Sequence, residues 1–155
     1  MKPIKAIYTL LSSDINITAN VYPQRIPEGA ALPAIALNQI SRIANDTKKE
    51  YSKSDISRIQ ITIVAETATE GYELSELVRS AMSATLPGVY NEVLVQNIAF
   101  ENEQTLVDDG ANEQGVFMVA QDYFVMVYNT LITSDSLLLE SGDFLLLEDG
   151  DKILL

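Results

Sequence analysis

The clearest pattern in the chain is an alternation of apolar and polar side chains over residues 58–65. Ile59, Ile61 and Ile63 share one side of this segment, which is typical of a strand with one buried face. Thr67 and Glu70 follow with the spacing of a capping box, in which a hydroxyl and a carboxylate satisfy free amide groups at the start of a helix. We therefore expect a strand, a cap and then a helix packed across the isoleucine face as the core.

The predicted helix ends at residues 86–88, where Leu-Pro-Gly interrupts the pattern. Its apolar residues recur at helical spacing and are Leu74, Leu77, Val78, Ala81 and Met82.

Weaker patterns predict the remaining elements. A short amphipathic helix is expected over residues 3–11, and strands over residues 21–25, 34–40, 93–100 and 116–131. The first of these strands contains Pro23, which suits the edge of a sheet. The polar stretch 41–57 is expected to be a long exposed loop or the tip of a hairpin, and the stretch 101–115 is expected to be an acidic loop. The last strand carries large apolar side chains on both faces, so we expect it to be covered on both sides.

The C-terminal segment, residues 132–155, repeats every eight residues. Asp135, Asp143 and Asp151 align, and the first two apolar runs are each closed by a turn that contains an acid, a glycine and an aspartate. This pattern predicts a short β-meander of three strands. Such short strands cannot form a core alone. We therefore expect the segment to dock on its own body, on a sister subunit or on a partner, with the last two favoured. The chain then divides into a domain at 1–131 and this extension.

Charge is unevenly distributed. Residues 1–86 hold nine Lys and Arg against nine Asp and Glu, whereas residues 87–155 hold one against thirteen, which accounts for the whole net charge of −12. An acidic half does not bind nucleic acid, because binding depends on Lys and Arg replacing counterions. Either the acids keep the chain soluble, or they form a surface past which DNA moves without adhering.

The sequence offers little catalytic chemistry. It contains no histidine and no cysteine, so the commonest general base and the usual zinc ligands are absent. It also lacks phosphate-binding glycine motifs and a nucleophile elbow. We expect no cofactor, no metal and no enzymatic activity. No run approaches the roughly 18 apolar residues of a membrane span.

Several turn and packing motifs resemble one protein family. The first helix ends Leu-Leu-Ser-Ser-Asp at residues 10–14, Val-Tyr-Pro follows at 21–23, and Pro-Glu-Gly-Ala-Ala-Leu-Pro-Ala-Ile occupies 27–35. With the strand at 58–61, the helix after it and Pro87-Gly88, these motifs resemble the tail completion proteins of long-tailed bacteriophages, also called tail terminators or head–tail joining proteins. The resemblance covers residues 1 to about 130. The C-terminal repeat resembles extensions on other phage structural proteins.

The resemblance implies an α+β fold, an antiparallel sheet with two helices on one face, assembled as a hexameric ring. In that family the ring caps the tail tube, ends its polymerisation and joins the tail to the head connector, and DNA passes through the lumen. It implies a virion protein assembled in the host cytoplasm, whose partners are its own copies, the tail tube protein and the connector. The alternatives are another neck or tail ring component, a tail-tube subunit, or a non-viral protein-binding module.

Two sets of residues are candidates for these contacts. We expect interfaces with the tube or with neighbouring subunits at Lys48, Lys49, Tyr51, Lys53, Leu138, Phe144, Leu146 and Leu154, the first four within the polar loop around residues 42–55. We expect an acidic lumen at Glu101, Glu103, Asp108, Asp109 and Glu113.

Overall fold

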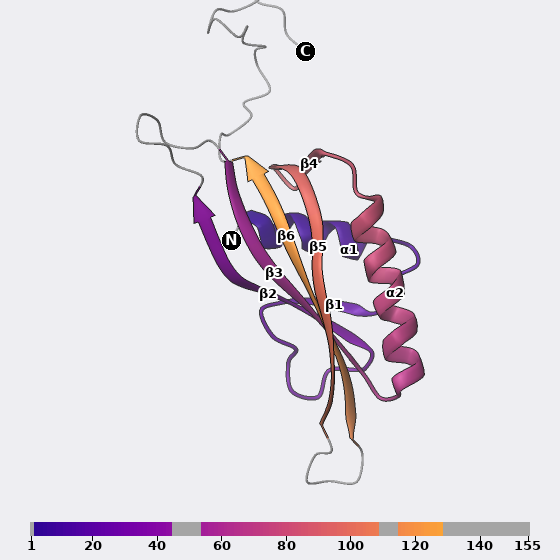
Figure 1. The fold of residues 1–155 in the computed structure, drawn as a ribbon. Helices are drawn as coiled ribbons and strands as arrows, with labels where there is room; N and C mark the ends of the chain where they lie inside the picture. The colour runs from indigo at the N-terminus through magenta and orange to yellow at the C-terminus, as the bar shows by residue number, and fades with distance from the viewer. Residues whose placement is uncertain (1, 45–53, 109–114, 129–155) are drawn as a thin grey trace, which may run out of the picture.

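The computed structural model describes residues 2–44, 54–108 and 115–128, which form one six-stranded sheet and two helices (Figure 1). In chain order the elements are α1 (Lys2–Ser13), β1 (Asn20–Pro23), β2 (Ala34–Ala44), β3 (Ser54–Ala65), α2 (Ala68–Ala84), β4 (Gly88–Tyr90), β5 (Val93–Asp108) and β6 (Val116–Tyr128). The α+β class is therefore confirmed. The predicted C-terminal meander lies outside the described residues.

The sheet has the strand order β1-β2-β3-β6-β5-β4 and is mixed. β1 runs parallel to β2, while every other pair is antiparallel. The prediction of a purely antiparallel sheet is thus wrong at one edge. The chain between β1 and β2 returns to the end of the sheet from which β1 started, and the amide of Gln24 donates to the carbonyl of Leu37 at 2.8 Å as this return begins.

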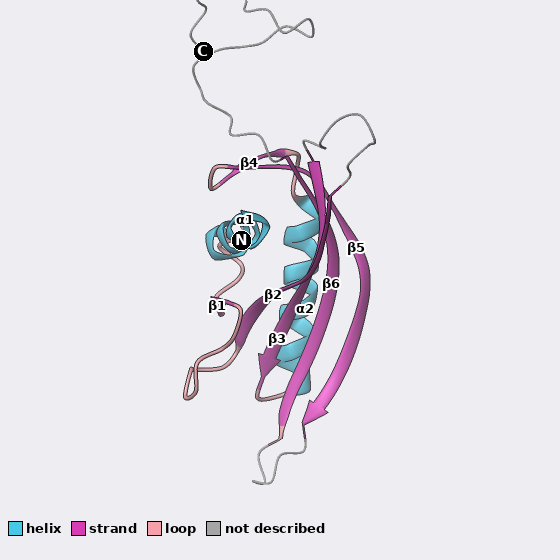
Figure 2. Ribbon diagram, turned by 90° about the vertical axis from the view of Figure 1, so that its left-hand side faces the viewer, coloured by secondary structure: helices cyan, strands magenta, loops and turns pink. Residues whose placement is uncertain are grey.

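Both helices lie on one face of the sheet, as predicted. Figure 2 shows the long strands bowing away from the helices, so we call the helix-covered side the concave face and the other the convex face. α2 packs on β3, β5 and β6, and α1 packs nearer the sheet edges. Ile59, Ile61 and Ile63 are fully buried in the core between the layers, which confirms the alternation that predicts β3.

Helix α2 begins and packs largely as expected. Thr67 is its N-cap, and its Oγ1 accepts a hydrogen bond from the amide of Glu70 at 3.3 Å. Leu74 and Val78 are buried, whereas Leu77 is 40% exposed. Leu77 was expected in the apolar stripe, but the buried line follows every fourth residue, and Leu77 lies to one side of it.

Glycine is required at one point of this helix. An added Cβ at Gly71 would lie 2.4 Å from Cδ1 of Phe117. The ring of Phe117 therefore packs directly on the helix backbone, where it also meets the ring of Tyr72 edge-on at 5.0 Å.

Two predicted loops are wrong over much of their length. The loop expected at 41–57 is strand at both ends, because β2 continues to Ala44 and β3 begins at Ser54. The loop expected at 101–115 is strand as far as Asp108, in register with β6. These segments are polar because one side of each faces solvent or a sheet edge. The last predicted strand is confirmed over residues 116–128.

A small polar cluster is buried beneath α2. Nε2 of Gln121 donates to the carbonyl of Ser75 at 3.0 Å, and the hydroxyl of Tyr123 donates to Oε1 of Gln121 at 2.9 Å. Tyr123 is 1% exposed, and burial raises the pKa of its hydroxyl well above the ordinary value, against the opposing effect of Arg79. The folded state therefore holds the proton of Tyr123 more tightly than the unfolded chain does.

The substitution Tyr123→Phe should show a pH-dependent effect on stability. At pH 7 the wild type should be more stable by about 1 kcal/mol, because the variant loses a buried hydrogen bond. Above about pH 10 the unfolded tyrosine ionises while the folded one does not. The advantage of the wild type should therefore shrink as pH rises, and vanish or reverse near pH 11. Urea unfolding of both chains at the two pH values measures this difference.

The matched control is Tyr8→Phe, whose side chain is 40% exposed and which should change stability little. A difference between wild type and Tyr123→Phe that stayed constant from pH 7 to 11 would contradict the assignment.

Candidate functional site

The convex face is the candidate interaction surface, because within residues 2–44, 54–108 and 115–128 no helix covers it (Figure 2). It carries two features, a network of charged side chains near its centre and an apolar groove beside that network. We expected β6 to be covered on both faces, but within these residues a helix covers only its concave face, and Phe124 on the convex face is 39% exposed.

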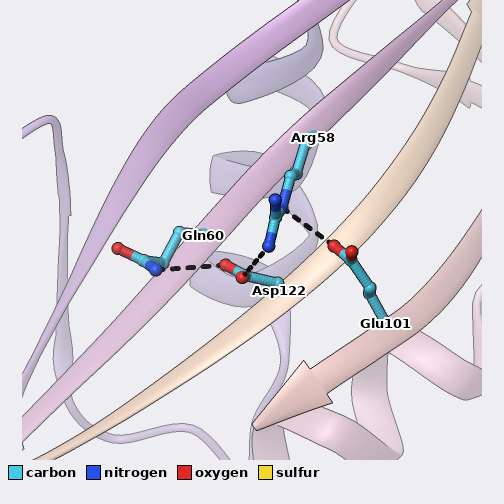
Figure 3. A network of polar contacts seen from close by, with 4 residues as sticks. All are labelled: Arg58, Gln60, Glu101 and Asp122. Carbon is cyan, nitrogen blue, oxygen red and sulfur yellow. Dashed lines mark hydrogen bonds and ion pairs between the residues drawn. The ribbon is translucent and has the colours of Figure 1, made fainter. Parts of the chain in front are cut away.

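The network joins three neighbouring strands through Arg58 (Figure 3). Nη2 of Arg58 lies 2.7 Å from Oδ2 of Asp122, and Nε lies 2.8 Å from Oε2 of Glu101. Nε2 of Gln60 donates to the other oxygen of Asp122 at 3.1 Å. Arg58 and Gln60 belong to β3, Asp122 to β6 and Glu101 to β5, so the network ties these strands together across the sheet.

Strand register and one β-bulge bring these residues together. Gln60 lies opposite Asp122, and Arg58 lies opposite Phe124 one step further along the same face. The register of β5 with β6 shifts between Phe100 and Asn102. A bulge of this kind re-aims a side chain, and here it accompanies the contact of Glu101 with Arg58.

Within the network Arg58 is the partner of a buried carboxylate. Asp122 is 5% exposed, and a carboxylate at that depth requires a partner. The hydrogen bond to Asp122 raises the pKa of Arg58, assisted by the charges of Asp122 and Glu101 and opposed by desolvation. Both oxygens of Asp122 are engaged by Arg58 and Gln60, which points to a structural role.

The apolar groove lies next to this network. It has a volume of about 410 Å³ and is lined by Ile43, Ile56, Asn97, Ala99, Phe124 and Met126. These residues come from four adjacent strands, in the order β2, β3, β6 and β5. The sequence pattern assigns Phe124 and Met126 to one face of β6, and the register confirms that assignment.

One sheet edge is open along most of its length. β4 pairs with β5 only from Val93 to Val95. In the described part of the chain no second strand pairs with β5 from residue 96 to residue 108. Leu106, on this stretch, is 54% exposed. An unpaired edge of this length is a template for pairing with another chain.

The described residues include only part of the predicted site. The expected interface residues Lys48, Lys49, Tyr51, Lys53, Leu138, Phe144, Leu146 and Leu154 lie outside the described residues, as do the acids Asp109 and Glu113. The two residues that bound the predicted contact loop, Arg42 and Asp55, lie in β2 and β3 and form an ion pair with each other.

The described acids of the predicted lumen do not share one surface. Glu101 contacts Arg58 on the convex face. Glu103 accepts a hydrogen bond at 2.7 Å from Nε2 of Gln121, which faces the helices. Asp108 is the last residue of β5. Glu101 and Glu103 thus lie on opposite sides of the sheet.

Sequence reasoning missed the network itself. One signal was present, because Asp122 stands in an apolar strand where a charge needs a partner. The described ranges contain no group of three or more Asp, Glu, His or Cys side chains able to hold a metal ion. Neither described helix is both long and apolar enough to cross a membrane.

The substitution Asp122→Asn should lower the melting temperature by about 3–6 °C, because it removes the buried charge that Arg58 binds and turns one hydrogen-bond acceptor into a donor. The matched control Glu101→Gln should lower it by less than about 2 °C, since about a third of each side chain in that ion pair is exposed. Calorimetry of the two variants gives the comparison. Equal effects would show that Asp122 does not anchor the network.

The fold is similar to that of one chain in a solved virion structure. A chain in a structure described as the virion of native gene transfer agent (GTA) particle superposes with a TM-score of 0.55 at 16% sequence identity. The similarity covers 81% of the present chain and 93% of that chain. No curated protein matches the sequence.

The sequence also matches a protein family directly. The family is described as Tail completion protein gp17, and the match extends over residues 5–123. It includes α1 from Lys5 onward, the whole of α2, the sheet up to Tyr123, and the turn motifs at residues 10–14 and 27–35. The resemblance to phage tail completion proteins is therefore confirmed, and the chain belongs to the tail completion protein gp17 family.

Proposed function

We propose that the protein forms a closed ring that caps the tail tube, ends its polymerisation and joins the tail to the head connector. The observation that carries this proposal is the family match over residues 5–123. The similarity to a chain of a gene transfer agent virion supports it, because that chain is covered almost completely by the same fold. The protein then acts in the tail of the virion as a structural component, without cofactor or catalysis, after assembly in the host cytoplasm.

The open edge of β5 supports a ring. A contact between this edge and a different part of the next copy is head-to-tail, and head-to-tail contacts close into a ring when the rotation allows it. The edge runs from residue 96 to residue 108 and includes the exposed side chain of Leu106. We assign this edge to the contact between neighbouring subunits, with six copies as the proposed number.

The acidic half of the chain supports a lumen that lets DNA pass. Negative charge repels the phosphate backbone, so a wall of Asp and Glu lowers adhesion during genome passage. Residues 109–115 connect β5 to β6 in the sequence, and Asp109 and Glu113 are part of this connection. We place the lumen at this connection together with Asp108. Glu101 and Glu103 lie on opposite faces of β5, so they do not belong to one wall together.

The remaining candidates are proposed contacts with other tail components. The basic and aromatic residues Lys48, Lys49, Tyr51 and Lys53 follow β2 and precede β3 in the sequence. We propose that they bind the tail tube protein or the adjoining subunit, and that the opposite side of the ring binds the connector.

Light scattering of the purified full-length chain should give a discrete mass near six times 17.1 kDa, because the proposed contacts close on themselves. Open-ended fibres would contradict a terminator and favour a tail-tube subunit. A monomer that remains monomeric in the presence of tail tubes would favour a protein-binding module of another kind.

The substitution Leu106→Lys should leave the fold intact and dissociate most of the ring, since it places a charge on the open edge of β5. Phage that carry this variant should build tail tubes of excessive and variable length, measured by electron microscopy. The control is Ile15→Lys, which changes a loop residue that is 91% exposed and should preserve ring mass and tail length. Normal tails with Leu106→Lys would remove the β5 edge from the proposed interface.

A further inference from the structure

The groove on the convex face is an apolar surface that lacks an occupant among the described residues. Five of its six lining residues are apolar, and Asn97 is the sixth. Ile43 is 64% exposed and Phe124 is 39% exposed. Apolar side chains gathered in one hollow at such exposure indicate a binding site, and its volume of about 410 Å³ lies within the range of ordinary ligand pockets.

The chain leaves its last strand beside this groove. β6 ends at Tyr128, and Met126, two residues earlier, is part of the groove lining. Met126 lies opposite Ile56 of β3, which lies opposite Ile43 of β2, so the groove extends from the end of β6 across these strands. Whatever follows Tyr128 in the sequence therefore starts next to the hollow.

The segment that follows has the composition to fill it. Residues 137–139 are three leucines, and residues 144–147 are Phe-Leu-Leu-Leu. Glu140 and Asp143 separate these runs, so the segment has apolar side chains to bury and charges to keep in water. Left in solvent, leucine runs of this kind favour aggregation.

The linker between Tyr128 and the first leucine run is long enough for that run to reach the groove. Residues 129–136 separate Tyr128 from the first leucine run, and an extended chain of that length spans roughly 26 Å. The groove is narrower than this, because its outermost strands, β5 and β2, are three strand spacings apart, or roughly 14 Å. The segment can therefore turn back and reach the whole groove of its own subunit.

We propose that residues 137–147 of the C-terminal segment occupy the groove lined by Ile43, Ile56, Phe124 and Met126 in the same chain. The leucine side chains enter the hollow, and the acids between them face solvent. The segment is thereby a covering for the convex face of its own subunit. This assignment concerns one subunit and does not depend on the ring.

The absence of cysteine from the sequence permits a clean cross-linking test in the full-length protein. Ala99→Cys places a thiol on the β5 side of the groove with little change in size, and it is combined in turn with Leu138→Cys or Leu146→Cys. After mild oxidation with oxidised glutathione, we expect at least one pair to form a disulfide within a single chain. Its yield should exceed that of the control pair Ser83→Cys with Leu138→Cys at least fivefold, since Ser83 is exposed on α2 behind the opposite face.

The products distinguish the possible occupants on a non-reducing gel. A disulfide within one chain supports the proposal. Disulfides between chains would overturn it and give the groove to a neighbouring copy. If neither groove pair gave a higher disulfide yield than the control pair, the proposal would also be overturned. The groove would then bind a different partner.

A second readout avoids engineered thiols and uses two native methionines. Met126 lines the groove, whereas Met118 lies on the same face of β6 at its other end. In full-length protein carrying Leu138→Ser and Leu146→Ser, peroxide should oxidise Met126 about fivefold faster than in the wild type. Met118 should be oxidised at an unchanged rate, as measured by mass spectrometry of peptides. Unchanged oxidation of Met126, or equal acceleration at both methionines, would overturn the proposal.

Discussion

The full-length pairing of β3 with β6 is the contact on which the rest of the structure depends. These strands lie antiparallel in unbroken register from Ser54 opposite Tyr128 to Ala65 opposite Phe117. Because side chains alternate between faces, this one register places Ile59 and Tyr123 together beneath the helices and Gln60 and Asp122 together on the convex face. A slip of one residue would exchange the two faces of a strand, so the core and the charged network are consequences of the same alignment.

The elements at the centre of the fold can be predicted from the sequence, because their buried faces require apolar residues at regular intervals. β3 alternates strictly, and α2 carries Leu74, Val78 and Met82 along its buried line. Edge elements have weaker patterns, since solvent accepts polar side chains there. This explains why the second half of β5, which contains Glu101 and Glu103, was predicted to be a loop. It also explains why the parallel pairing of β1 was not predicted. β1 is only four residues long, and its direction depends on how the chain returns to the sheet.

The candidate site was predictable only in part, because its geometry depends on pairs of strands. Asp122 could be identified as unusual from one strand alone, since it interrupts an apolar run. Its partners could not, because Arg58 and Gln60 meet it through the register, and the contact of Glu101 with Arg58 accompanies a bulge in β5. The groove is a property of four strands together, and no local pattern in any one of them indicates it. The family, by contrast, is recognisable from the sequence, because its turn motifs are local.

The charged network also separates the interaction surfaces of the subunit. It fastens β3, β6 and β5 to one another midway along the convex face, and the apolar groove lies to one side of it, near the end of β6. The contact of Arg58 with the buried carboxylate of Asp122 admits few geometries, so it resists shear between the strands that would flatten or widen the groove. On the convex face the network therefore lies between the apolar groove and the other end of the strands, where the side chain of Leu106 is exposed. Arg58 contacts both Asp122 of β6 and Glu101 of β5, so it is the residue through which the three strands are held together.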